Sequence, residues 1–493
     1  MSDPTAFDVI VIGGGVNGAG IARDAAGRGA KVLLLEARDL ASGTSSASTK
    51  LVHGGLRYLE YHEFALVREA LQEREILWGI APHLIRPMRF VLPRGEGLRP
   101  RWMLRLGLFV YDHLGGRKRL PGAKAIDLRK HPAGKVLDPA LTDGFEYSDT
   151  WVDDARLVVL NALDAHEKGA EVRTHTPVLS ARREGDLWLV ETHSGTFAGR
   201  ALVNAGGPGA DDVARLAGEE PPYGIRRVRG SHIVTRKLFD HPYAYIFQLP
   251  DTRICFAIPY ERDFTLIGTT DRDHKGSLIE VSAGADEIGY LCESASRYFA
   301  KPVTRDDVVW TYAGVRALVD DGSGRPEAAT RGYRIPISDP SRGAPLLGVY
   351  GGKITSYRHL SEEAVNLLGK RMPELSAPGW TARTPLPGGN FPVDGQPALI
   401  ASLQAKHPFL SDSDATRIVR AYGTRAARWL GEAKDWTDLG RGFGAGLSEA
   451  ELRYLSDAEW AICADDVLWR RSKLGLHMSE AQRQAVADWF GAR

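Results

Sequence analysis

The chain has little cysteine, with only Cys255, Cys292 and Cys463 among its 493 residues. These residues form no Cys-x-x-Cys pair and show no other spacing typical of metal ligands. The sequence therefore predicts no metal site built from them. It predicts reduced thiols in the core of a protein kept in a reducing compartment.

An excess of one charge is also missing, because 63 Lys and Arg stand against 62 Asp and Glu, for a net charge of +1. No overall field favours a nucleic-acid partner, so any basic function must be local. No uncharged apolar run reaches the roughly 18–20 residues that a bilayer-spanning helix needs. The N-terminus lacks the pattern of a secretory signal, and these absences together predict a protein on the cytoplasmic side of the membrane.

What is present begins with a βαβ pattern near the N-terminus. The apolar runs Val9–Ile12 and Val32–Leu35 predict two buried parallel strands. A helical pattern joins them, from about Gly18 to Gly29. The sequence therefore predicts that the fold is organised around an α/β unit at this end of the chain.

Three glycines at the first turn of this unit complete a dinucleotide-binding fingerprint. Gly13 suits the tight turn, Gly15 the close approach of a pyrophosphate, and Gly18 the close packing of helix against strand. The pyrophosphate would lie at the helix N-terminus, where free N–H groups and the helix dipole favour negative charge. Glu36 ends the second strand and is placed to accept hydrogen bonds from an adenosine ribose.

A long polar loop follows Glu36 and extends to about Leu59. Loops of this length inside compact domains are usually functional or disordered, and its glycines and reactive side chains favour function. The pattern of Glu63–Trp78 then predicts a helix.

Residues 99–119 are the one strongly amphipathic and basic stretch of the chain. On a helix, one face would carry Arg101, Arg105 and Asp112, and another Met103, Leu106, Val110 and Leu114. Two interpretations stay open. The helix packs on the core as an ordinary surface helix, or it lies on anionic lipid, reinforced by Arg117, Lys118 and Arg119.

The middle of the chain predicts two sheets. Residues 172–204 alternate apolar and polar side chains as a small meander that returns to a core strand. Short strands between about residues 224 and 347 suggest an antiparallel sheet inserted as a substrate domain. Leu346–Tyr350 predicts a last core strand, followed by a helix from about Ser356.

The C-terminal region is predicted to be a separate helical domain. Proline and glycine cluster between Pro378 and Pro397, which makes this stretch the best linker candidate. Beyond it, Ser448, Ser456 and Ser479 each precede a Glu or Gln by three residues, the capping-box pattern of a helix start.

The chain has elements for both ends of a long cofactor, which favours FAD over NAD. The turns at Gly206 and at Gly352, together with the loop Ser42–Lys50, could approach the cofactor beyond its pyrophosphate. Gly352 and Lys353 are predicted to open a helix whose dipole would stabilise negative charge on a reduced flavin.

Several longer motifs are more specific than the glycine fingerprint. They are IGGGVNGAGIARDAAGRG, TSSASTKLVHGGLRYLE, FEYSDTWVDDARLV, RGSHIV, IGTTD, TYAGVRAL, GGKITSYR and ADDVLWRRSKLGL. On these motifs, nearly end to end, the chain resembles the FAD-dependent, respiratory-type glycerol-3-phosphate dehydrogenases, which belong to the D-amino-acid-oxidase-like flavoproteins.

The resemblance implies an α/β fold, α+β overall, in three parts. These are a Rossmann-type FAD-binding domain (residues 1–75, 145–223 and 345–385), an inserted antiparallel-sheet substrate-binding domain (76–144 and 224–344, with the basic segment at 99–119), and a C-terminal helical cap domain (386–493).

The resemblance also implies an activity, the oxidation of sn-glycerol 3-phosphate to dihydroxyacetone phosphate by hydride transfer from C2 to FAD. The predicted FAD contacts are Gly13, Gly15, Asn17, Gly18, Glu36, Thr44, Ser45, Ser48, Lys50, Leu51, Val178, Gly206, Gly352, Lys353, Ile354 and Thr355. The predicted substrate contacts are Arg57, Tyr58, Thr269, Arg316, Arg331 and Lys353.

The residue chemistry agrees with this implication, because four cations around one small ligand suit a phosphate better than a carboxylate. Arg316 and Lys353 suit alkoxide stabilisation or proton handling. His232 is the candidate general base from the ordinary pKa of imidazole, although a strand-end histidine is more often structural. His53 is expected to shape the cofactor loop, and Arg470 and Arg471 to form structural ion pairs.

The remaining implications concern partners. The resemblance implies ubiquinone or menaquinone as the electron acceptor, peripheral attachment to the inner face of the cytoplasmic membrane, and a homodimer. The alternatives are a glycerol-3-phosphate oxidase using oxygen, an amine or amino-acid oxidase on the same scaffold, a non-catalytic flavin-binding sensor, and an NAD-dependent dehydrogenase.

Overall fold

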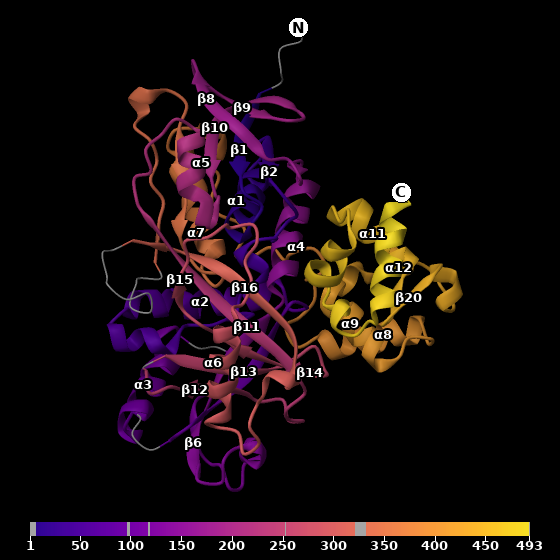
Figure 1. Cartoon of the computed structure of the whole chain (residues 1–493). Helices are drawn as coiled ribbons and strands as arrows, with labels where there is room; N and C mark the ends of the chain where they lie inside the picture. Colours follow the sequence, from indigo (N-terminus) through magenta and orange to yellow (C-terminus); the bar gives the residue numbers. More distant parts are fainter. Residues whose placement is uncertain (1–5, 96–98, 117–118, 252, 321–331, 493) are drawn as a thin grey trace.

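The computed structural model describes residues 6–95, 99–116, 119–251, 253–320 and 332–492, so that Arg117, Lys118 and Arg331 lie outside the described residues. Figure 1 shows three parts: one sheet with its helices at the top, a second sheet below it, and a helical C-terminal part, drawn in gold and yellow, at the side. This is the mixed α/β architecture that the sequence predicts.

The first sheet is built on the predicted βαβ unit. Its strands are β1 (Phe7–Ile12), β2 (Val32–Leu35), β7 (Glu171–Arg173), β8 (Val178–Glu184), β9 (Leu187–Thr192), β10 (Gly195–Asn204) and β18 (Leu346–Gly348). Strands β7, β2, β1, β10 and β18 are parallel, and β9 and β8 continue from β10 as an antiparallel meander. The predicted meander and the core strand β10 are therefore confirmed.

Helices complete this part. They are α1 (Val16–Gly27), α4 (Asp154–Glu167), α5 (Ala210–Leu216) and α7 (Tyr357–Gly369). Apolar residues of α1, α4 and α7 pack with β1, β2 and β10 in one buried cluster. The helix predicted from about Ser356 is confirmed, since α7 begins at Tyr357. Gly352 and Lys353 do not open this helix as predicted, because they precede the turn that leads into it.

The second sheet is mainly antiparallel. Its strands are β3 (Leu51–Val52), β4 (Ile85–Pro93), β5 (Lys124–Asp127), β6 (Asp143–Val152), β11 (Ile225–Arg236), β12 (Ala244–Gln248), β13 (Ile254–Tyr260), β14 (Phe264–Gly268), β15 (Arg272–Asp273) and β16 (Val308–Val319). Helices α2 (Phe64–Ile80), α3 (Arg101–Leu114) and α6 (Ala285–Ser296) and the two-stranded sheet of β17 (Tyr333–Arg334) and β19 (Tyr350–Gly351) accompany it.

One strand joins a different sheet from the one expected. Residues 145–152 are predicted to lie in the FAD-binding domain, but β6 pairs with β4 along its whole length in the second sheet. The chain returns to the first part only after β6, at α4. The physical reason is the long run of backbone pairing between β6 and β4, which local sequence patterns do not encode.

The C-terminal part is helical, as predicted. It contains α8 (Gln396–Lys406), α9 (Asp412–Tyr422), α10 (Ala427–Leu430), α11 (Glu449–Glu459), a π-helical turn (Asp466–Arg471), α12 (Glu480–Gly491) and the short strands β20 (Gly442–Gly444) and β21 (Leu447–Ser448). Ser448 and Ser479 cap α11 and α12 as predicted. The predicted cap at Ser456 is wrong, because Ser456 lies inside α11.

Two further expectations concern the cysteines and the helices. Cys255 and Cys292 are buried in the core of the second sheet, but Cys463 is exposed, which corrects its placement in the core. Within the described residues, every helix is too short or too polar to cross a bilayer.

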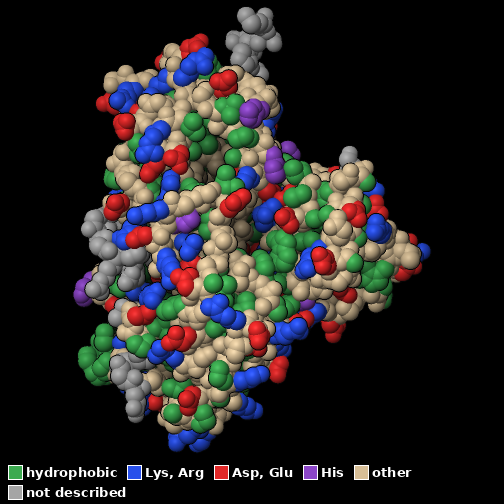
Figure 2. Space-filling view, in the orientation of Figure 1, with side chains coloured by type: hydrophobic (Ala, Val, Ile, Leu, Met, Phe, Trp, Pro, Cys, Tyr) green, Lys and Arg blue, Asp and Glu red, His purple; other side chains and the backbone are tan. Residues whose placement is uncertain are grey.

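Helix α3 turns an apolar face to solvent. Its buried residues are Leu104, Leu108 and Tyr111. Its exposed apolar residues are Trp102, Met103, Leu106 and Phe109, with Trp102 70% and Phe109 60% exposed. Of the apolar residues predicted to share a face, Met103 and Leu106 are exposed, and Val110 and Leu114 are half-buried. Figure 2 shows hydrophobic side chains gathered over this helix at the lower left of the molecule.

Candidate functional site

A cavity of about 510 Å³ lies where the two sheets meet. Its walls come from the turn after β1, the loop after β2, strands of the second sheet, and the turn before α7. Of the predicted cofactor contacts, those that line it are Gly13, Gly15, Asn17, Glu36, Thr44, Ser45, Ser48, Leu51, Gly206, Gly352, Lys353, Ile354 and Thr355. Gly18, Lys50 and Val178 are not among the lining residues.

The glycines of the fingerprint are required by close approaches. Gly13 has φ +113°, and a Cβ there would lie 2.4 Å from the carbonyl oxygen of Ala205. A Cβ at Gly18 would lie 1.9 Å from the carbonyl oxygen of Gly13. Gly18 therefore serves the packing of α1 against the turn, while Gly15 at the N-cap of α1 leaves the helix N-terminus open to the cavity.

Glu36 lies half-buried at the edge of this turn. Its carboxylate accepts hydrogen bonds from the backbone N–H groups of Gly14, at 2.6 Å, and Arg38, at 2.8 Å. Burial raises the pKa of Glu36, and these two N–H groups oppose the rise. The structure therefore holds an acceptor oriented by its own backbone at the place where the sequence predicts a ribose contact.

Residues 39–50, here called the cofactor loop, form one wall of the cavity. Ser45 Oγ accepts a hydrogen bond from the Val16 N–H at 3.0 Å, which joins the loop to the start of α1. Thr44 Oγ1 donates to the carbonyl of Val315 on β16 at 2.5 Å. The loop is thus tied to both parts that enclose the cavity.

Lys50 has a structural place at the end of the cofactor loop. Its Nζ donates to the Asp154 carboxylate at 2.8 Å and to the Ser46 carbonyl at 3.0 Å, and the side chain is buried. Ser48 donates to the same carboxylate through its N–H and its hydroxyl. Asp154 of α4 therefore holds the far end of the cofactor loop.

Three of the four predicted substrate cations line the cavity: Arg57, Arg316 and Lys353. Lys353 Nζ lies 3.7 Å from the centre of the Tyr58 ring, a cation–π contact. Arg57 Nη2 donates to the Tyr61 hydroxyl at 3.1 Å. The cavity therefore combines a dinucleotide turn with a concentration of positive charge.

Arg316 is held by the end of β14. Its Nη2 donates to Thr269 Oγ1 at 2.9 Å, and its Nη1 donates to the Thr270 carbonyl at 3.1 Å and to Asp271 Oδ1 at 2.5 Å. Thr269 and Asp271 also line the cavity. The sequence did not predict Asp271, although it stands two residues after Thr269 in the same motif.

The structure does not bring His232 into the cavity wall. Its Nε2 lies 2.9 Å from Thr49 Oγ1, and its ring stacks on Tyr312 with centroids 4.7 Å apart. Burial, followed by the charges of Arg316 and Lys50, holds the pKa of His232 well below its ordinary value. Thr49 lines the cavity in its place.

His53 does line the cavity. Burial and the nearby charges of Lys353 and Arg74 lower its pKa to about 3, so that the imidazole is neutral at physiological pH. Its backbone N–H donates to Thr355 Oγ1 at 3.3 Å, which places it beside the turn before α7. From the sequence, His53 was expected only to shape the cofactor loop, and no local pattern indicates that it, and not His232, lines the cavity.

The arrangement supports a defined chemistry. The turn and helix N-terminus suit a dinucleotide phosphate, three cations suit a second anionic group, and a neutral imidazole can accept a proton beside them. These features share one cavity, so an anionic substrate would be bound next to the cofactor.

Comparisons with known proteins agree with this description. The family model described as "FAD dependent oxidoreductase" matches residues 8–352, and the model described as "C-terminal domain of alpha-glycerophosphate oxidase" matches residues 380–490. Both models therefore follow the division between the two-sheet body and the helical C-terminal part.

Two curated relatives are similar over almost the whole chain. The aerobic glycerol-3-phosphate dehydrogenase of Escherichia coli is 49% identical, with 98% of this chain and 97% of the relative covered. The D-erythritol 1-phosphate dehydrogenase of Brucella abortus is also 49% identical, with 99% of each covered. In fold, the chain is similar to the glycerol-3-phosphate dehydrogenase of Bacillus halodurans, solved with FAD, at a TM-score of 0.77 and 24% identity, covering 99% of this chain and 94% of that one.

Proposed function

The chain belongs to the FAD-dependent glycerol-3-phosphate dehydrogenases, and from this premise we propose that it oxidises sn-glycerol 3-phosphate to dihydroxyacetone phosphate and passes the electrons to a membrane quinone. The single observation that carries the proposal is the meeting of three cations, Arg57, Arg316 and Lys353, with the dinucleotide turn in one cavity. A carboxylate substrate would need about one arginine, whereas a phosphate ester uses several cations.

The residues present fit FAD. The N-terminus of α1, which opens to the cavity at Gly15, suits the pyrophosphate, and Glu36 suits the ribose. The cofactor loop and the turn at Gly352–Thr355 would hold the rest. When bound, FAD supplies a two-electron hydride acceptor.

Each polar residue of the cavity has a proposed task. Arg57 binds the substrate phosphate, and Lys353, fixed against Tyr58, completes its binding. Arg316 donates to the C2 oxygen as charge develops there, and it is already oriented by Thr269 and Asp271. Arg331 is proposed as a further phosphate contact from the resemblance alone.

The hydroxyl proton needs an acceptor in the same cavity. His53 lines the cavity and is unprotonated at physiological pH, and it is proposed as this acceptor. Its lowered pKa makes it a weak base, so the proposal rests on its position in the cavity. His232, the candidate from the sequence, reaches the cavity only through the Thr49 hydroxyl at 2.9 Å. Its proposed role is therefore to orient Thr49.

Peripheral attachment to the inner face of the cytoplasmic membrane is proposed from helix α3. The exposed apolar side chains of Trp102, Leu106 and Phe109 stand beside the basic residues Arg101 and Arg105. Aromatic anchors with flanking arginines are typical of helices that lie in the lipid interface. A quinone dissolved in the bilayer would then be the nearby electron acceptor.

A homodimer is proposed from the resemblance, and analytical ultracentrifugation tests it.

A second candidate substrate is D-erythritol 1-phosphate, because the Brucella relative matches this chain as well as the Escherichia relative does. The decisive assay follows reduction of a soluble quinone by the purified enzyme with each phosphate ester and with unphosphorylated glycerol. A higher kcat/KM for glycerol 3-phosphate supports the proposal. A higher kcat/KM for D-erythritol 1-phosphate would identify that ester as the substrate. Hydrogen peroxide formed in place of reduced quinone would identify an oxidase.

A further inference from the structure

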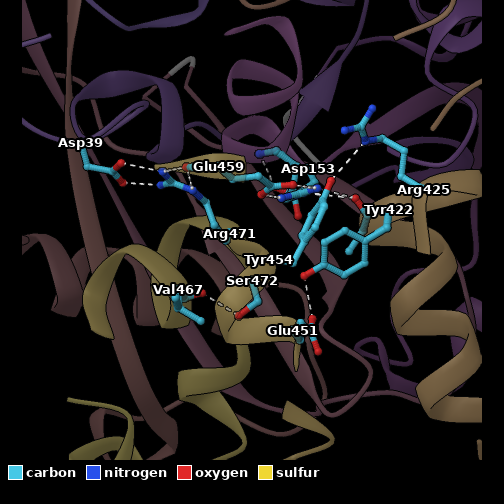
Figure 3. A network of polar contacts seen from close by, with 12 residues as sticks. Asp39, Asp153, Tyr422, Arg425, Glu451, Tyr454, Glu459, Val467, Arg471 and Ser472 are labelled. Atoms are coloured by element: carbon cyan, nitrogen blue, oxygen red, sulfur yellow. Dashed lines mark hydrogen bonds and ion pairs between the residues drawn. The ribbon is translucent and has the colours of Figure 1, made fainter. Parts of the chain in front are cut away.

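The cofactor loop is held at its start by one buried carboxylate. Asp39 is 1% exposed, and its Oδ1 accepts a hydrogen bond from Arg471 Nη2 at 2.7 Å. Its Oδ2 accepts from Arg470 Nε at 2.5 Å and from Arg471 Nη1. Figure 3 shows the Asp39 carboxylate facing the Arg471 guanidinium, which comes from the C-terminal ribbon. The predicted structural ion pairs of both arginines are thereby confirmed.

Both arginines belong to the π-helical turn Asp466–Arg471. The Ser472 N–H donates to the Val467 carbonyl at 2.9 Å, the five-residue spacing of a π-turn, and the Ser472 hydroxyl donates to the same oxygen. Such turns are rare and are frequently found at functional sites. Here the turn presents two consecutive arginines to a single carboxylate about 430 residues earlier in the chain.

The far end of the cofactor loop is linked to the same domain by a second route. Asp154 on α4 holds Ser48 and Lys50. Two residues later, the buried Arg156 forms a bidentate ion pair with the buried Glu459 of α11, with one contact at 3.1 Å. The carbonyl of Glu459 accepts hydrogen bonds from Arg471. The loop, α4 and the C-terminal domain therefore form a closed circuit of contacts.

The acidic residues near Asp39 do not need a metal ion to balance their charge. Ligand atoms of Asp39, His175 and Asp466 lie within 4.8 Å of one another. However, Arg470 and Arg471 already neutralise Asp39, and Arg470 also pairs with Asp466. The guanidinium groups supply the positive charge that a metal ion would otherwise supply.

We propose that the C-terminal helical domain retains the flavin, by clamping the cofactor loop through Asp39, Arg470 and Arg471. The loop residues 41–45 and 47–49 line the cavity, and Ser45 also contacts the start of α1. A movement of Asp39 therefore opens the wall that encloses the cofactor. By linkage, the flavin must in turn stabilise the docking of the C-terminal domain. The inference rests on the FAD assignment made above.

The test measures the rate at which FAD leaves the holoenzyme, followed by the rise of free-flavin fluorescence. Asp39→Asn and Arg471→Lys should each release FAD about tenfold faster or more, since coupling between sites spans roughly 5- to 150-fold. The double variant should release FAD more slowly than the product of the two single effects predicts, because both changes break the Asp39–Arg471 contact.

The matched control is Glu167→Gln. Glu167 on α4 pairs with Arg425 of the C-terminal part at 2.7 Å across the same interface, but it does not contact the cofactor loop. Because this pair is partly exposed, FAD release should stay within about twofold of the wild type. A release rate within the same twofold range for both Asp39→Asn and Arg471→Lys would overturn the proposal.

A measurement on the unaltered protein covers the case in which the variants do not fold. Hydrogen exchange of the amides in residues 459–472 is compared between the holoenzyme and the flavin-stripped protein. Slower exchange with FAD bound is expected, and equal exchange overturns the proposal. A purified protein without flavin would contradict the cofactor assignment itself, so the two failures are distinguishable.

Discussion

The position of Arg316 depends on a glycine on the neighbouring strand. Gly230 on β11 pairs with Gly314 on β16, and a Cβ at Gly230 would lie 2.3 Å from Arg316 Nη2. The missing side chain is therefore the space that the guanidinium occupies. The absence of a side chain at Gly230 therefore helps to set the position of a proposed catalytic group.

Gly230→Ala should therefore lower kcat/KM while leaving the protein folded, because only the flexible end of Arg316 has to move. Displacing a group by about 1 Å can cost roughly 100-fold in rate. Steady-state kinetics with glycerol 3-phosphate measure the effect. The control is Gly442→Ala, where a Cβ meets nothing within 4 Å. Unchanged kcat/KM in Gly230→Ala would show that the orientation of Arg316 does not matter.

Removal of the guanidinium should have a larger effect. Arg316→Ala is expected to lower kcat by about 10²–10³, the range seen when one donor to a developing oxyanion is lost. FAD should stay bound, since the fingerprint glycines and α1 are unchanged and Arg316 is held by Thr269, Thr270 and Asp271 on the opposite wall. The measurement is kcat together with the flavin-to-protein ratio, with Arg129→Ala, an exposed arginine paired with Asp127, as the control. Near-normal turnover would refute the assignment of the substrate site.

Substitutions of His53 and His232 are expected to slow flavin reduction to different degrees. His53→Gln should lower the rate of flavin reduction by about 10²–10⁴, the usual contribution of a general base. His232→Gln should lower it less, because Thr49 lies between His232 and the cavity. Anaerobic single-turnover kinetics compare the two variants. A greater loss in His232→Gln would return the role of base to the residue that the sequence favours.

At the scale of elements, sequence patterns predicted what is local. The strand–turn–helix at Gly13 and the caps at Ser448 and Ser479 follow from neighbouring residues, and the structure has them. Ser456 carries the same capping pattern but lies inside α11, because packing of the helix overrides a local signal. Strand β6 joined the second sheet through its long pairing with β4, which no local pattern encodes.

The candidate site shows the same limit. The lining glycines and cations were predictable because each stands in a recognisable motif. The partners that orient them come from distant segments: Gly230 lies beside Arg316, and Arg471 holds Asp39. His53, in a loop, lines the cavity, and His232, on β11, does not. This difference is set by tertiary packing.

Helix α3 offers a test of membrane contact. Burying a large apolar side chain contributes about 1.5–3 kcal/mol, so the double change Trp102→Ser and Phe109→Ser should weaken vesicle binding by tenfold or more. Co-sedimentation with anionic vesicles measures it. Leu179→Ser is the control, since Leu179 is 41% exposed on β8, which lies far from α3 in Figure 1. Equal binding of all three proteins would contradict a role of α3 in the interface.

At the scale of the whole molecule, His83 lies where the body meets the C-terminal part. Its ring approaches Gly388 and Gly423, and burial followed by the charge of Arg156 lowers its pKa to about 3. In the unfolded chain His83 binds a proton below its ordinary pKa of about 6.5, and in the folded protein it does not. Folding stability therefore falls as the pH drops below about 6.5.

The expected loss is about 1.4 kcal/mol per pH unit, or about 2 kcal/mol between pH 6.5 and pH 5. The thermal midpoint of the wild type should decrease over this range. The decrease should be shallower in His83→Gln, which has no group to titrate at this position. Parallel pH profiles for the two proteins would show that His83 does not contribute.

The central claim is that one cavity brings a flavin and a polyol phosphate together. Its most direct test is the visible flavin spectrum of the purified protein without oxygen, before and after addition of glycerol 3-phosphate. We predict that the flavin band bleaches with this ester and does not change with glycerol or with a D-amino acid. A yellow protein that glycerol 3-phosphate leaves unbleached would keep the fold and contradict the function.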